Sequence, residues 1–421
     1  MKELSRIARG VRASTTMAID SLYKQMKAEG QDVIGFAAGE PDFNTPDHIK
    51  EAAYQAIRDN FTRYTPASGM VELKQAACDR MKADCGVDYT PAQVVIASGA
   101  KHMVYLALRA LVNPGDEVIL PTPAWVSYYE LIRIVGGIPV MLPASEEEDF
   151  KITPEKLEQA ITTQTKAIIL NNPSNPTGMV YDAGQLQALA DVCVRHDLYI
   201  IADEIYYGLL YDGKTFTSIA SLGEEVKRRT ILVNGVSKSY AMTGWRMGYL
   251  CGPAPLIKQM LKLHQFGIMS APTTSQYAAI EAMRNGDRDI EKMRDEYDGR
   301  RHGGAHRVPG RGLHHAGSFS GPPGLHGGAY EPDPRGKLYS PRGRFLRHDE
   351  HSKADRADPR RRHDPGRQRF CHRLFETGPC GGRARRRLWR SRLCPLVLRH
   401  LHGKYQGGSG SAGSLFGKLI S

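Results

Sequence analysis

The run Leu198–Tyr206 constrains the fold more than any other segment of this 421-residue chain. Its sequence, LYIIADEIY, is apolar and β-branched up to an acid, as in a buried parallel strand with Asp203 at its carboxyl end. In open α/β sheets, ligands bind at that end of the strands. An aspartate that follows a strand can also be a helix N-cap, so Asp203 has a second interpretation.

Two other predicted strands also lead into distinctive junctions. Ala167–Leu170 runs into the turn-dense segment Asn171–Gly178. Val94–Ala97 runs into Ser98-Gly99-Ala100-Lys101, and a helical pattern follows from His102 to Leu111. Small residues at such a junction allow backbone N–H groups and the helix dipole to face a phosphate. Taken singly, the first junction is an ordinary loop and the second a turn of a kind that often binds nothing.

The segment Ser237–Arg246, SKSYAMTGWR, places a lysine between a hydroxyl and an arginine. Desolvation or neighbouring cations make a lysine amine nucleophilic, which suits Schiff-base chemistry with an aldehyde. Ser237 and Arg246 suit a phosphate on the same molecule. In isolation the segment reads as a solvated loop, so its meaning depends on the other motifs.

Together these motifs resemble the pyridoxal-phosphate enzymes of fold type I, specifically the class I aminotransferases related to aspartate aminotransferase. The resemblance extends from about Leu4 to about Tyr297 and includes three further motifs: Ala38–Phe43, Tyr64–Gly69 and Pro121–Tyr128. It implies an α/β fold whose large domain has a mostly parallel seven-stranded sheet flanked by helices. We expect an N-terminal arm and small-domain segment in residues 1–45, the cofactor-binding large domain in 46–290, and a remnant of the small domain in 291–421.

The resemblance implies a role for each matching residue. Lys238 would bind the cofactor covalently and then move the catalytic proton, and Asp203 would pair with the pyridine nitrogen. Asn175 and Tyr206 would hydrogen-bond the phenolic oxygen. Trp125 would stack on the ring, although an aromatic residue after a proline also suits a core. The implied phosphate-binding residues are Ser98, Gly99, Ala100, Ser237, Arg246 and Tyr64 of the partner subunit.

The resemblance also implies substrate contacts and a homodimer with shared sites. Gly39 would present its backbone to the substrate carboxylate, near Trp125 and Asn175. Lys101 and Arg12 match positions that bind an acidic side chain in some relatives.

Composition bounds the setting of the protein. Seven cysteines without paired spacing suit a reduced, cytoplasmic protein. The first residues, MKELSR, lack the apolar core of a signal peptide, and no apolar run is long enough to cross a membrane. Cysteine and histidine spacing indicates no metal site.

The net charge of +12 comes entirely from the last part of the chain. Residues 301–421 contain 25 lysines and arginines against 8 acidic residues, which leaves the first 300 residues at −5. Such a basic tail is typical of nucleic-acid binding. We favour another interpretation, because the tail has no helical or strand period and consists mainly of Arg, Gly, Pro and His clusters.

A shift of reading frame near Asp298–Gly299 would explain this tail. In an offset frame, Cys394–Gln406 is compatible with Val-Arg-Leu-Ser-Tyr-Ala-Thr-Ser-Met-Glu-Asn-Ile-Lys, which matches the family motif that carries the arginine for the substrate carboxylate. Gly343–Arg347 and Arg383–Trp389 are compatible with two more family motifs in the same frame. We therefore expect the small domain to be lost, the tail to be disordered from about residue 299, and the activity to be impaired.

By descent, the predicted function is transfer of an amino group from aspartate or a related amino acid to a 2-oxo acid, 2-oxoglutarate being the expected acceptor, by ping-pong kinetics. Aromatic or broad amino-acid specificity is the first alternative. A carbon–sulfur lyase of the same fold is the second, and a non-enzymatic protein is the third. The expected partners are small-molecule substrates and a second copy of the chain, with no nucleic acid and no membrane.

Overall fold

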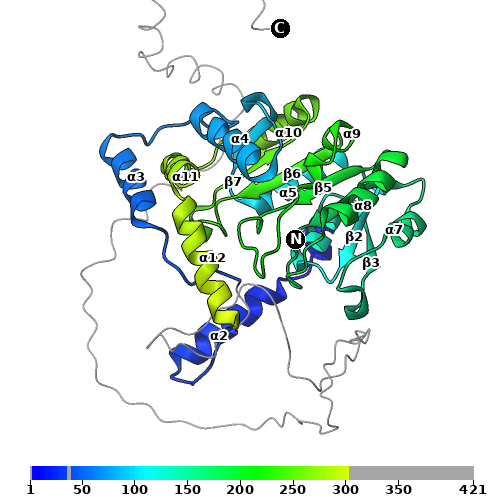
Figure 1. Ribbon diagram of the computed structural model, residues 1–421, viewed down its shortest axis with the longest axis horizontal. Helices are drawn as coiled ribbons and strands as arrows, with labels where there is room; N and C mark the ends of the chain where they lie inside the picture. Colours follow the sequence, from blue (N-terminus) through cyan, green and yellow to red (C-terminus); the bar gives the residue numbers. More distant parts are fainter. Residues whose placement is uncertain (1, 36–38, 303–421) are drawn as a thin grey trace, which may run out of the picture. The chain divides into compact units, whose positions relative to one another are not determined.

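The computed structural model describes residues 2–35 and 39–302, which fall within one compact unit (Figure 1). Its centre is a seven-stranded sheet in the spatial order β1-β7-β6-β5-β4-β2-β3. The strands are β1 Val94–Ala97, β2 Glu117–Thr122, β3 Ile138–Pro143, β4 Thr165–Asn171, β5 Tyr199–Asp203, β6 Thr230–Gly235 and β7 Gly248–Cys251. Only β7 runs antiparallel to its neighbours, which confirms the predicted mostly parallel sheet.

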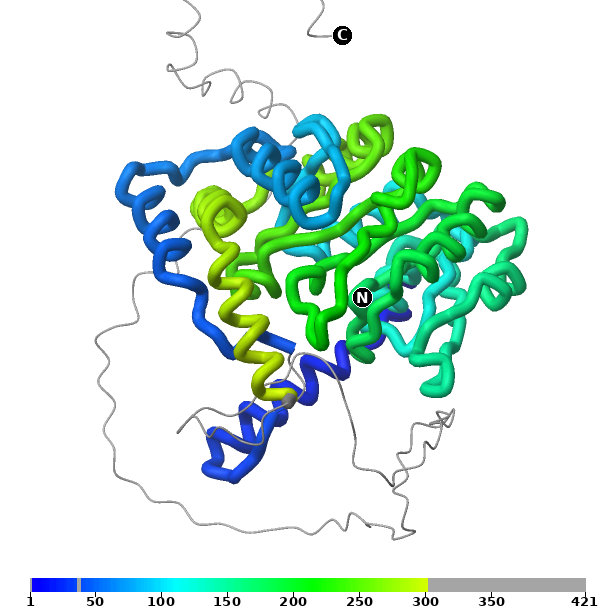
Figure 2. Tube along the Cα trace, in the orientation of Figure 1, coloured from blue at the N-terminus to red at the C-terminus, as the bar shows by residue number. Residues whose placement is uncertain are grey.

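Helices cover both faces of this sheet, whereas α1 and α2 bury no residue. The bounds of the described α-helices are α1 Arg6–Gly10, α2 Thr15–Ala28, α3 Asp47–Arg58, α4 Val71–Cys85, α5 Ala100–Leu111, α6 Val126–Ile134, α7 Pro154–Ala160, α8 Ala183–Arg195, α9 Glu224–Lys227, α10 Ala254–Gly267, α11 Thr273–Asn285 and α12 Asp287–His302. In the Cα trace, α3 and α11 lie side by side although they are far apart in the sequence (Figure 2).

Strand side chains alternate between two cores. Along β4, Ala167 and Ile169 pack with buried residues of α5, α6 and α10. Ile168 and Leu170 point the other way and pack with α7 and α8. This two-residue period is the pleat of a strand covered on both faces, so the four successive residues Ala167–Leu170 are all apolar.

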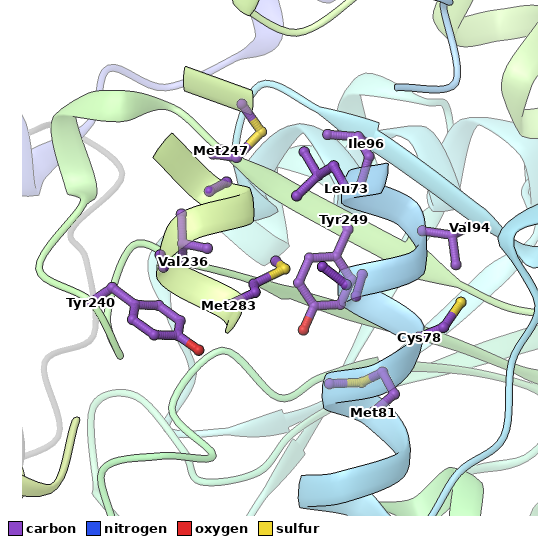
Figure 3. Packing of buried hydrophobic residues seen from close by; sticks show 14 of the residues in the cluster. Leu73, Cys78, Met81, Val94, Ile96, Val236, Tyr240, Met247, Tyr249 and Met283 are labelled. Carbon is purple, nitrogen blue, oxygen red and sulfur yellow. The ribbon is translucent and has the colours of Figure 1, made fainter. Parts of the chain in front are cut away.

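A third core fixes the position of β1 (Figure 3). Leu73 and Met81 of α4 pack with Ile96 of β1, Tyr249 of β7 and Met283 of α11, and all five side chains are at most 4 % exposed. Burial of side chains of this size stabilises the fold by about 1.5–3 kcal/mol each. It also holds the end of β1, from which the turn at Ser98 begins.

Register brings the ends of the strands to one edge of the sheet. Because β7 is antiparallel, its first residue, Gly248, lies opposite both Ala97, at the end of β1, and Gly235, at the end of β6. Arg246, two residues before Gly248, is thereby carried to the loops that follow β1 and β6. The carboxyl ends of β2, β4 and β5 share this edge.

Helix α12 continues through His302, beyond the expected frame change at Gly299. Arg300 pairs with Asp42 at 2.7 Å and Arg301 pairs with Asp212 at 3.0 Å. The predictions for residues 303–421, including the frame shift, the disorder and the lost small domain, lie outside the described residues. Among the described helices, none combines the length and apolar character that a bilayer span requires.

Candidate active site

The turn after β1 and the segment before β7 form one cationic cup. Gly99 caps α5 with a φ of +86°, and a Cβ atom at this position would collide with the guanidinium of Arg246. A Cβ at Gly248 would lie 2.6 Å from the backbone nitrogen of Ala100. Both glycines are therefore required for the close approach of Arg246 to the N-terminus of α5, where exposed N–H groups favour an anion.

Lys238 lies just beyond β6, where Ser237 is 7 % exposed. The Lys238 Nζ donates a hydrogen bond to the carbonyl oxygen of Gly39 and lies 5.8 Å from the centre of the Tyr206 ring. Burial lowers the pKa of Lys238; Glu40 and Asp203 oppose this change, and Arg246 adds to it. A lowered pKa increases the fraction of neutral, nucleophilic amine.

Asp203 ends β5 and is 3 % exposed. Its Oδ2 accepts a hydrogen bond of 2.7 Å from the Tyr128 hydroxyl, and its Oδ1 accepts one of 3.2 Å from the Ile205 backbone. Burial raises the pKa of this carboxyl to about 6, while both hydrogen bonds and Lys238 oppose the rise. No α-helix begins at Asp203, so the helix N-cap interpretation is wrong.

Asn175 and Tyr206 meet beside these groups. The Asn175 amide donates to the Tyr206 hydroxyl at 3.3 Å. The Asn175 backbone N–H donates to the Asn171 side chain at 2.7 Å, and Asn171 in turn donates to the Asp203 carbonyl oxygen at 2.9 Å. The turn-dense segment after β4 is therefore fastened to the end of β5.

Trp125 and Lys101 complete the cluster. The Trp125 ring stands edge-on to Tyr128, with ring centres 5.2 Å apart, and the Lys101 Nζ lies 4.8 Å from the Trp125 ring. Burial and the nearby Arg246 both lower the pKa of Lys101. These contacts link Lys101 back to the cationic cup.

The residues of this cluster lie at the ends of β1, β2, β4, β5 and β6 or just before β7, and the contacts above join them to one another. Gly39 is joined to it through Lys238. Arg12 is not: it is exposed between α1 and α2, and none of the described residues forms a hydrogen bond or ion pair with its side chain. Tyr64 is 84 % exposed, so it stands clear of its own subunit's core.

Sequence reasoning missed three contributors to this site. Tyr128 binds Asp203, Asn171 links two loops, and Glu40 influences Lys238. The spacing of Tyr128, three residues after Trp125, could have placed it on the same side of α6. Nothing local to Asn171 or Glu40 indicates their long-range contacts.

The polar groups of this site match a phosphorylated pyridine aldehyde. Arg246, two hydroxyls and a helix N-terminus suit the phosphate; an amine suits the aldehyde; a buried carboxylate suits a protonated ring nitrogen. Within the described ranges, no group of three or more His, Cys, Asp or Glu residues could hold a metal ion.

Comparisons with known proteins agree with this chemistry. The family model described as aminotransferase class I and II matches residues 31–318. Aspartate aminotransferase of Geobacillus stearothermophilus is 48 % identical over 300 residues, which is 71 % of this chain and 76 % of the relative. The Bacillus subtilis enzyme of the same name is 45 % identical, with the same coverage.

Solved structures give the same result. Thermus thermophilus aspartate aminotransferase with maleate aligns with a TM-score of 0.69 at 39 % identity, covering 72 % of this chain and 78 % of that one. The aromatic aminotransferase of Pyrococcus horikoshii aligns with a TM-score of 0.63 at 39 % identity, covering 66 % and 75 %. By sequence, by fold and by the chemistry of its site, the chain belongs to the class I and II aminotransferases, a family of pyridoxal-phosphate-dependent transaminases.

Proposed function

We propose that this protein is an aspartate aminotransferase by descent and that the cluster around Lys238 is its active site. The observation that carries the proposal is the convergence of Lys238, Asp203 and the Asn175–Tyr206 pair on one edge of the sheet. Bound pyridoxal phosphate would act as an electron sink for charge that develops on the substrate carbon. The remaining work falls to side chains of this chain.

Lys238 is the proton carrier in this proposal. Its burial lowers the pKa of the amine, so the neutral form that can accept a proton from the substrate carbon is more populated. The Gly39 carbonyl accepts a hydrogen bond from Nζ and restrains the side chain at the mouth of the site. In this proposal, Gly39 would present its backbone to the substrate carboxylate next to Lys238.

Asp203 and Asn175 hold the ring in place. The Asp203 carboxylate would pair with the protonated ring nitrogen, and the buried environment strengthens that pairing. The Asn175 amide and the Tyr206 hydroxyl, already hydrogen-bonded to each other, would bind the phenolic oxygen. Trp125 would cover one face of the ring, although in this structure its edge contact is with Tyr128.

Phosphate binding falls to the cationic cup. Arg246 would supply the charge, Ser98 and Ser237 hydroxyl donors, and the Gly99–Ala100 turn backbone N–H groups. Charge-assisted hydrogen bonds of this type are about twice as strong as neutral ones.

Lys101 supports an acidic substrate side chain. Its ammonium lies beside Trp125 and near Arg246, so the site has a second cation that the phosphate does not require. The relatives named aspartate aminotransferase agree with this preference. Arg12 would have to approach from another subunit or after a movement of the N-terminal segment.

The test of the proposal is replacement of the lysine. We expect Lys238→Ala to abolish both the absorbance of the covalently bound cofactor and turnover of aspartate with 2-oxoglutarate. Lys262→Ala, on the exposed face of α10, is the matched control and should retain both. Turnover that survives in Lys238→Ala would refute the site. A panel that includes phenylalanine and cystathionine separates aromatic specificity and lyase activity from aspartate transamination.

We further propose a homodimer with shared active sites. Tyr64 is 84 % exposed and follows a loop at the end of α3, which suits a contact with the phosphate of the partner subunit. Mixing Tyr64→Ala with Lys238→Ala subunits should restore activity, because each mixed dimer keeps one site with both residues intact. Neither variant alone should be active, and a mixture that stays inactive would contradict the shared site.

The buried free thiols Cys78, Cys85, Cys193 and Cys251 suit the reducing cytoplasm, where we expect the protein to act.

A further inference from the structure

Tyr128 is a buried residue of the site that has no role in the mechanism above. It lies in the first turn of α6 and is 2 % exposed. Its hydroxyl is 2.7 Å from Oδ2 of Asp203. Burial, with Asp203 nearby, raises the pKa of Tyr128 well above its ordinary value, so the phenol keeps its proton and is the donor in this hydrogen bond.

The Tyr128 ring is itself held in place. Trp125 contacts it edge-on, with ring centres 5.2 Å apart and planes at 88°. It also belongs to the hydrophobic core that contains buried side chains of β1, β2, α5 and α6. Because packing fixes the ring, the hydroxyl of this tyrosine is held in one position, and little conformational entropy is lost when it donates its hydrogen bond.

Asp203 depends on few partners. Oδ1 accepts only the Ile205 backbone N–H and Oδ2 accepts only the Tyr128 hydroxyl among the described residues. The titratable groups facing this carboxyl are Tyr128, Lys238, Glu204 and Tyr206. Burial raises the pKa of Glu204 to about 8 and that of Tyr206 to about 12, whereas Lys238 is the cation that opposes the rise in the pKa of Asp203.

We propose that Tyr128 is a positioning residue that holds the Asp203 carboxylate ionised and in one orientation, ready to pair with the protonated ring nitrogen of the cofactor. This inference rests on the proposed function. Removal of the hydroxyl leaves one carboxylate oxygen buried without a donor, which favours the protonated acid. A protonated Asp203 cannot form an ion pair with the ring nitrogen.

The test measures cofactor binding rather than turnover. Pyridoxamine 5′-phosphate makes no imine with Lys238, so its dissociation constant reports only the non-covalent contacts. We expect Tyr128→Phe in the full chain to bind it about threefold more weakly near pH 6.5, since loss of one such hydrogen bond shifts the pKa of Asp203 upward by about one unit from its wild-type value of about 6. Above about pH 8.5 the two proteins should bind alike, because Asp203 is then ionised in both.

Two controls separate positioning from general damage. Tyr129→Phe removes the hydroxyl of the neighbouring residue. The Tyr129 ring lies beside the Arg133 guanidinium rather than beside Asp203, so this variant should leave the pH dependence unchanged. A carbocyclic cofactor analogue that lacks the ring nitrogen should bind wild type and Tyr128→Phe equally at every pH. If Tyr128→Phe does not fold, a fluorinated tyrosine at position 128, which is a stronger donor, should shift the binding profile to lower pH.

The outcomes are distinguishable. A wild-type protein that binds no pyridoxamine 5′-phosphate would refute the proposed function itself. A wild type that binds it, with a Tyr128→Phe profile that matches wild type, would overturn the role of Tyr128 alone. A uniform loss of affinity for both cofactor and carbocyclic analogue would show that Tyr128 only supports the fold.

Discussion

Glycine at position 99 and glutamate at position 204 illustrate two ways in which single residues shape the structure. Gly99 makes room, because a side chain there would occupy the place of the Arg246 guanidinium. Glu204 is 2 % exposed, with Oε1 bound by the Ser218 hydroxyl at 3.0 Å and the Ile219 N–H at 3.2 Å, and with no described partner for Oε2. Gly99 acts by leaving space for a neighbouring side chain, whereas Glu204 acts through a carboxyl whose burial favours the protonated form.

We expect Gly99→Ala to weaken binding of pyridoxamine 5′-phosphate by about 10–100-fold, because the displaced guanidinium loses a charge-assisted contact with the phosphate. Isothermal titration calorimetry measures this change. Gly115→Ala is the matched control: its φ of +94° imposes the same backbone strain, but no atom lies within 4 Å of its Cβ position. Gly115→Ala should cost stability of about 1 kcal/mol and leave affinity unchanged. Equal affinity in both variants would contradict the steric argument.

We expect Glu204→Gln to flatten the pH dependence of stability. Burial raises the pKa of Glu204 from 4.5 to about 8, so between these values the folded chain holds a proton that the unfolded chain has lost. The free energy of unfolding of wild type therefore falls as pH rises through this window, whereas glutamine does not titrate. Relative to wild type, the variant should gain on the order of 1–3 kcal/mol between pH 5 and 8 in urea unfolding. Exposed Glu291→Gln should show the wild-type slope, and a Glu204→Gln slope equal to wild type would sink this account.

At the scale of elements, α3, α11 and α12 meet at one histidine. His48 of α3 lies 2.8 Å from Glu281 of α11 and 2.8 Å from Asp289 of α12. Burial lowers the pKa of His48, but the hydrogen bonds to Asp289 and Glu281 outweigh it, and the net pKa is raised. Below the raised pKa of His48, its charged imidazole therefore pairs with acids of both α11 and α12.

We expect His48→Gln to remove a stabilising contribution that is fully present below about pH 6.5. In wild type this contribution disappears as pH rises through the raised pKa of His48, because the charged form is the one that pairs. The effect should be about 0.5 kcal/mol, since the side chain is 37 % exposed and the pair is screened. Hydrogen exchange of α12 amides at pH 5.5 and 8 measures it, and α12 protection that rises with pH in wild type would contradict the sign.

The strand ends were predictable at this scale because local pattern decides them. Val94–Ala97 was predicted as a strand and is β1, and Asp203 was predicted at the carboxyl end of its strand and ends β5. The helix after Gly99 begins at Ala100 rather than at His102, because the glycine cap, not the apolar period, sets its first turn.

At the scale of the whole molecule, the alignment with relatives and the composition of the tail both bear on whether the chain has a complete substrate site. The Geobacillus relative is matched over 76 % of its length, and the family match ends at residue 318. The frame-shift hypothesis implies that the tail lacks the arginine that binds the substrate carboxylate in this family. A cofactor site without that arginine would bind the cofactor and turn substrate over poorly.

We expect a chain with the offset frame restored after residue 298 to transaminate aspartate at least about 100-fold faster than the present chain, at similar affinity for pyridoxamine 5′-phosphate. The reason is that a bidentate arginine–carboxylate pair is worth several kcal/mol in orientation and binding. Steady-state kinetics of both proteins measures this ratio. Equal kcat/KM in the two chains would contradict the frame-shift hypothesis, as would a nucleotide sequence without the three family motifs in any offset frame.

The sequence by itself placed Ala97 and Asp203 at the ends of strands through local apolar patterns. Its resemblance to the class I aminotransferases implied the roles of Lys238, Asn175 and the phosphate-binding residues. The tertiary structure alone decided that Tyr128 donates to Asp203 and that Lys238 reaches Gly39, which is 199 residues away in the chain. It also separated Lys101, which joins the cluster, from Arg12, which does not. Such contacts depend on sheet register and on the packing of α6 and β7, and no local stretch of sequence contains that information.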